Sequence, residues 1–177
     1  FSSYSIDDFF GLESYLHLEG FAYKLGEKIN SNEEIIALRV GQINEDKMFE
    51  NFIHKFQWKN FNKPNLYYNE IEREMVKQFY DNSICLAYKL LQNNKTDKAI
   101  IVCNILTENL PLSLHYNPVA AADLAIIYSL LEREEKSEEY IWKATEQFSE
   151  IMQQYFSLNV SQQAQDRIQM QKIENQW

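Results

Sequence analysis

The chain has 177 residues, of which 45% are hydrophobic and 24% charged, and these are ordinary values for a globular protein. Its net charge of −9 repels phosphate groups, so we expect no nucleic-acid partner and no direct binding to lipid. The longest nearly apolar run, residues 119–131, is too short to span a bilayer, which needs about 20 residues.

The opening segment predicts a small mixed region. An acidic pair followed by apolar residues predicts a short helix over about residues 7–20. Apolar and polar residues then alternate over 21–29, and residues 35–40 are rich in β-branched and aliphatic side chains. Because the turn-forming residues 30–32 separate these two runs, we expect a β-hairpin here.

Helices are expected over the rest of the chain. No glycine occurs after Gly41, and a long stretch without glycine cannot easily form a meander of short strands. Asn44 is a predicted N-cap for a helix that ends near Phe56, and residues 63–65 form a break. The longest predicted helix covers residues 69–92.

The next predicted helix begins after a turn at residues 93–95, has Thr96 as its N-cap and stops before Pro111. A further helix starts at Asn117-Pro118 and reaches about Arg133.

After that helix, residues 134–136 are the predicted turn, and Ser137 is the N-cap of the last large helix, which carries apolar residues to Tyr155. A final helix is expected from Val160. The fold class is therefore mainly α.

One segment has the spacing of a helical-hairpin repeat. Ala87, Ala99 and Pro111 are separated by two equal steps of twelve residues. Small residues let two helices approach closely, and a proline ends the second helix, as in tetratricopeptide (TPR) repeats. We expect TPR-like antiparallel hairpins over residues 67–177, preceded by an N-terminal segment over 1–66, together forming one structural unit.

If the TPR resemblance holds, one face of the first repeat helix lines a groove for a protein or peptide. Helical spacing places Asp81, Ile84, Tyr88 and Gln92 near that face, and they are our candidate binding residues. The alternative is that these side chains pack on a neighbouring hairpin or meet solvent.

The histidines do not form a strong catalytic pattern. Glu13 and His17 have helical i, i+4 spacing, and with Glu19 they predict at most a weak metal or acid–base site. We expect His54 to be structural and His115 to be a solvated loop residue.

The acidic clusters and the cysteines have structural interpretations. We expect the acids at positions 70, 72 and 74 and the charged run 132–136 to be solvated. Cys85 and Cys103 are expected to be buried thiols on neighbouring helices. The alternative, if the chain is exported, is a disulfide between them. The chain has no phosphate-binding loop or metal motif, so we expect no cofactor, no metal and no catalysis within it, with an unrecognised hydrolase as an alternative.

Three stretches together show a family resemblance. They are YLHLEGFAYKL at residues 15–25, NEDKMFENFIHKFQW at 44–58, and YYNE at 67–70 leading to Leu86-Ala87. In order and spacing they resemble the C-terminal soluble region of a bacterial multi-pass membrane protein family. The N-terminal part of that family is a glycosyltransferase-C-like module, similar to protein O-mannosyltransferases. The resemblance covers residues 12–111.

The resemblance implies a location and a role. The chain would be a non-catalytic, extracytoplasmic (periplasmic) interaction domain of a membrane-anchored, glycosyltransferase-like protein. Its partners would be a protein or peptide, such as the acceptor, and the membrane module of the same parent chain. Because Phe1 is not an initiator methionine, we also expect the chain to be a piece of a longer protein. The alternative is a free-standing TPR-like adaptor.

Overall fold

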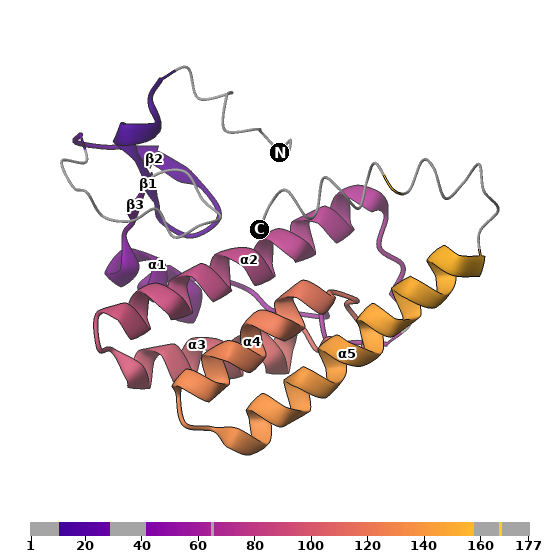
Figure 1. Ribbon diagram of the computed structural model, residues 1–177. Helices are drawn as coiled ribbons and strands as arrows, with labels where there is room; N and C mark the ends of the chain where they lie inside the picture. The colour runs from indigo at the N-terminus through magenta and orange to yellow at the C-terminus, as the bar shows by residue number, and fades with distance from the viewer. Residues whose placement is uncertain (1–10, 29–41, 65, 158–166, 168–177) are drawn as a thin grey trace. The chain divides into compact units, whose positions relative to one another are not determined.

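The computed structural model describes residues 11–28, 42–64, 66–157 and 167 (Figure 1). Within these residues it contains five α-helices and a small three-stranded sheet, which confirms the mainly α fold class. The chain divides into two compact units, Phe1–His115 and Tyr116–Trp177. We had expected a single unit whose N-terminal segment ended at residue 66.

The sheet has a different topology from the expected hairpin. A 3-10 turn at Glu13–Tyr15 leads into β1 (Leu16–Leu18), which pairs antiparallel with β2 (Tyr23–Leu25) and parallel with β3 (Gln42–Ile43) (Figure 1). The helix predicted to reach Gly20 is therefore wrong from Leu16 onward, and of its described residues those in the 3-10 turn at Glu13–Tyr15 are helical. Leu16 and Leu18 are buried while His17 between them is half-buried, which is the two-residue period of a strand.

The predicted strand over residues 21–29 exists in part, as β2, but its partner in the described residues is β1. The predicted turn at 30–32 and the run 35–40 lie outside the described residues. A tight turn joins β1 to β2, and Gly20 within it has a φ of +126°, a conformation open to glycine. A Cβ on Gly20 would also lie 3.3 Å from the Phe56 ring.

Helix α1 (Glu45–His54) begins where the sequence predicted. The Asn44 side chain accepts a hydrogen bond of 3.2 Å from the backbone N–H of Lys47, and acidic residues occupy the first turn. Met48 and Phe52 are almost completely buried on one face of the helix. The Asn51 amide donates to the backbone carbonyl of Glu19 at 2.7 Å and so ties α1 to the β1–β2 turn.

Aromatic rings hold the segment after α1 in place. Their centroids lie 3.8 to 6.2 Å apart in stacked, tilted and edge-on pairs, and most of these distances fall in the range of about 4.5–7 Å in which aromatic contacts are favourable. The rings come from the β1–β2 turn, from α1 and its exit, and from the following helix: Phe21, Phe52, Phe56, Trp58, Phe61 and Phe79. Six of the chain's 3 Trp, 11 Tyr and 11 Phe residues are gathered here.

Helices α2 (Glu70–Gln92) and α3 (Thr96–Asn109) form a hairpin. Asn69 and Glu72 make a reciprocal capping box at the start of α2. Ala87 and Ala99, the small residues that predicted the hairpin, are both fully buried. The predicted Thr96 cap is wrong: Lys95 occupies the N-cap position and makes no side-chain capping bond.

The far end of this hairpin is tied by a buried tyrosine. Tyr80 is fully buried, and its hydroxyl donates to the backbone carbonyl of Leu110, the C-cap of α3. This contact lies near the opposite end of α3 from the 93–95 turn, so α2 and α3 run antiparallel. Cys85 on α2 and Cys103 on α3 are both buried, as the sequence predicted.

The second unit contains the helical pair α4 (Pro118–Leu130) and α5 (Glu134–Ser157) (Figure 1). Asn117 caps α4 by accepting from the backbone N–H of Ala120 at 3.0 Å, as the sequence predicted. Tyr128 and Tyr140 stack with centroids 5.4 Å apart and join the two helices.

Helix α5 begins four residues earlier than predicted, at Glu134 and not after Ser137. The turn consists of residues 131–133, with Glu132 at a φ of +56°, and the acids that follow occupy the first turn of α5, where the helix dipole favours them. Ser137 is therefore not an N-cap. Its hydroxyl instead donates to the carbonyl of Ala125 at 2.9 Å and fastens α5 to α4. The helix predicted from Val160 lies outside the described residues, apart from Arg167.

Candidate functional site

The four groove residues lie on α2 in different environments. Asp81 and Tyr88 are half-buried, Gln92 is exposed at the end of the helix, and Ile84 is 2% exposed. All side chains from residue 82 to residue 87 are buried, so this stretch of α2 is covered on every side. Ile84 is thus a core residue, whereas the other three side chains keep part of their surface exposed.

The histidines occupy positions that local spacing did not predict. Because His17 lies in β1 and not on a helix, its predicted helical pairing with Glu13 is wrong. The His17 Nε2 atom lies 3.0 Å from the Glu27 carbonyl, and the Glu19 carboxylate lies 3.9 Å from the Lys24 amine. His54 is exposed at the end of α1.

His115 is buried, so the expectation of a solvated loop histidine is wrong. Its Nε2 atom lies 2.8 Å from the carbonyl of Phe61, and its ring meets the Tyr68 ring edge-on at 5.2 Å. Burial, with a smaller contribution from the Glu72 charge, raises the pKa of Tyr68. His115 therefore ties the connection between α1 and α2, at Phe61 and Tyr68, to the segment that follows α3.

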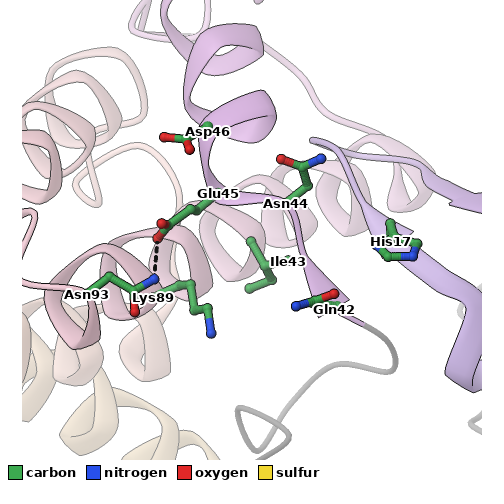
Figure 2. A pocket seen from close by; sticks show the side chains of 8 residues that line it. All are labelled: His17, Gln42, Ile43, Asn44, Glu45, Asp46, Lys89 and Asn93. Atoms are coloured by element: carbon green, nitrogen blue, oxygen red, sulfur yellow. Dashed lines mark hydrogen bonds between the residues drawn. The ribbon is translucent and has the colours of Figure 1, made fainter. Parts of the chain in front are cut away.

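A polar pocket of about 300 Å³ lies where the sheet meets the start of α1 and the end of α2 (Figure 2). Figure 2 shows the Glu45 carboxylate hydrogen-bonded to the Asn93 amide, and the distance is 2.8 Å. Sequence reasoning missed this pocket because its lining comes from three separated segments: His17, Gln42, Ile43, Asn44, Glu45, Asp46, Lys89 and Asn93.

Ion pairs beside the pocket link α1 to the α2–α3 turn. The Lys95 amine lies 2.6 Å from Glu45 and 3.0 Å from Asp46, and the Lys98 amine lies 3.2 Å from Asp46. Hydrogen bonds from Lys95 and then Lys98 lower the pKa of Asp46, and those to Glu45 and Asp46 raise the pKa of Lys95. The Asp46 carboxylate is thus held ionised, which suits a structural clamp better than proton transfer.

Among the side chains that the structure describes, no three His, Cys, Asp or Glu residues are grouped as potential ligands of a metal ion. The second unit has a feature of another kind, an exposed apolar face on α5. We call it the α5 stripe, and its members are between 42% and 70% exposed: Ile141, Trp142, Phe148, Met152 and Phe156.

The α5 stripe lies beside the face that packs on α4. Ser137, Tyr140 and Gln147 face α4 and are buried, whereas the stripe residues are not covered. Gln147 is the last buried residue of α5, and its backbone carbonyl accepts from the Tyr116 hydroxyl while its side chain accepts from the Asn117 N–H, just before α4 begins. Beyond Gln147, α5 continues for ten more residues.

No protein-family model, curated protein or solved structure matches the chain. Within the described part of the chain, no helix has both the length and the apolar character needed to cross a membrane.

Proposed function

We propose that this chain is a non-catalytic helical interaction domain that binds a protein or peptide through the α5 stripe. The observation that carries the proposal is the exposure of Trp142 (70%) and Phe156 (69%) on one helix together with three further large apolar side chains. Large aromatic and aliphatic side chains left in water are characteristic of interaction sites, where they act as anchors.

The geometry of α5 supports this role. Its buried face already contacts α4 through Tyr140 and Ser137, so the α4–α5 hairpin does not need the stripe for its own packing. Transfer of apolar surface from water contributes about 25 cal/mol per Å², and a partner that covered the stripe would gain this stabilisation. A purely structural helix of this length would carry polar side chains on the uncovered face.

The location of the domain is part of the proposal. The resemblance of residues 15–25, 44–58 and 67–70 to the soluble region of a glycosyltransferase-like membrane protein family supports an extracytoplasmic domain attached to such a protein. The partner would then be an acceptor protein or the membrane module itself. Several hydrophobic segments of about 20 residues encoded upstream of Phe1 would support this attachment, and their absence would favour a free-standing TPR-like adaptor.

Photo-crosslinking tests the interaction role. A photoreactive phenylalanine analogue replaces Trp142 in the full-length protein in the cells that produce it, and Ile71 on α2, also 70% exposed, is the matched control position. We expect a defined adduct with another polypeptide, or with the membrane module of the same chain, from position 142 and not from position 71. The absence of any adduct from position 142, or equal adducts from both positions, would contradict the proposal.

A further inference from the structure

We infer that the segment that docks on the α5 stripe is an amphipathic α-helix with basic side chains beside its apolar face. The inference rests on the proposed function and specifies the chemistry of the partner. It draws on the spacing, the length and the charge of α5.

The spacing of the α5 stripe matches a helical partner. The stripe residues Ile141, Phe148 and Met152 are separated by seven and four residues, which is the spacing of the rows that meet in a coiled coil, and the polar Thr145 fills the position between the first two. Trp142 and Phe156 border this row on the side away from α4. A second helix can insert side chains between such rows, whereas an extended peptide would gain a ladder of main-chain hydrogen bonds only at an open sheet edge, which a helix does not offer.

The length of α5 leaves room for that helix. Its 24 residues extend about 36 Å, whereas the 13 residues of α4 extend about 20 Å. The stripe runs from Ile141 to Phe156, about 22 Å at 1.5 Å per residue, so a partner helix of about four turns covers it.

The charge of α5 selects a basic partner over a second copy of the chain. The helix carries six acidic residues and two lysines, a net charge of −4. Glu138 lies one turn before Trp142, and Glu146 follows it by one turn. One of the lysines, Lys143, is already paired with Glu139. Two α5 helices side by side would bring like charges together, whereas lysine or arginine beside an apolar face would be attracted.

Fluorescence anisotropy with the full chain and a designed peptide tests the inference. The probe is a labelled amphipathic peptide of about 18 residues with leucine at seam positions and lysine beside them. One control peptide has glutamate in place of every lysine, and the other has the same composition in scrambled order. We expect the basic probe to bind at least about tenfold more tightly than either control, and more weakly as salt rises.

Matched substitutions locate the binding surface. Phe148→Asp removes the centre of the stripe and should weaken binding of the basic probe at least about tenfold. Ile126→Asp on α4 changes a residue that is 50% exposed outside the stripe, and it should leave binding within about twofold. Glu146→Gln should weaken binding less than Phe148→Asp and reduce its salt dependence. Circular dichroism of each variant checks that the helices are retained.

Several results would overturn the inference. Two concern the peptides: equal affinity for the basic and acidic peptides, or an equal loss of affinity in Phe148→Asp and Ile126→Asp. Two concern the chain itself: a dimer of the chain that buries the stripe, or residues of the same chain that cover it. If crosslinks from position 142 form in cells while the basic peptide fails to bind, the proposed function stands and the helical basic partner is wrong. If neither is seen, both are wrong.

Discussion

Replacing Tyr80 by phenylalanine removes one oxygen atom from the interior of the first unit. The Tyr80 side chain is fully buried, and its hydroxyl donates to the carbonyl of Leu110, which is itself buried. That carbonyl belongs to the C-cap of α3 and has no partner within the helix, so Tyr80 replaces the missing intrahelical donor.

The expected cost of Tyr80→Phe follows from this geometry. The ring continues to fill its space, so no cavity forms, and the loss is that of a donor to a buried carbonyl. Such a loss lowers the free energy of unfolding by about 1–3 kcal/mol. Each kcal/mol corresponds to a fall of about 2–4 °C in the melting temperature of a chain of this size.

Urea unfolding followed by circular dichroism measures the effect. Tyr67→Phe is the matched control, because Tyr67 is 86% exposed and loses the same atom into solvent. We expect the control to change the free energy of unfolding by less than about 0.5 kcal/mol. Equal stability of the two variants would show that the Tyr80 hydroxyl does not hold the end of α3, and the reasoning would be refuted.

Two further predictions concern the caps and the clamp. Asn69→Ala removes the side chain that accepts from the Glu72 N–H in the capping box of α2. It should lower the free energy of unfolding by about 1 kcal/mol in the same assay. The control, Asn62→Ala in an exposed turn, should have little effect. The pKa of Asp46 is lowered from its ordinary 3.8, so its charge stabilises the folded state above that pH, and the effect is lost as pH falls through the lowered value. Urea unfolding should therefore show Asp46→Asn to be less stable than the original chain at neutral pH, with the difference shrinking in acid and in high salt; a difference independent of pH would argue against the clamp.

Helix positions were predictable because their signals are local. Asn44, Asn69 and Asn117 cap α1, α2 and α4 by accepting from the backbone N–H three residues ahead, so the capping interactions lie within one turn of sequence. The buried alanines of the α2–α3 hairpin were also visible as a spacing, because a short turn fixes which residues of two helices face each other. The failures at Thr96 and Ser137 show that a capping residue type does not by itself select the cap when a neighbour can begin the helix.

The sheet and the burial of His115 depended on contacts between distant residues. β1 was predicted as helix because its three residues are too few to show a period, and its pairing with β3 joins segments more than twenty residues apart. The burial of His115 depends on Phe61, 54 residues earlier, and the polar pocket draws on three separated segments. No local pattern contains this information.

The sequence shows all the apolar residues of α5. It does not show which of them α4 covers. Tyr140 and Phe148 have similar character, yet one is buried against α4 and the other is 42% exposed. The sequence by itself determined a chain of capped, amphipathic helices, because those signals act over a few residues. The tertiary structure alone decided which apolar face stays in water, because α4 is shorter than α5 and covers only one side of it.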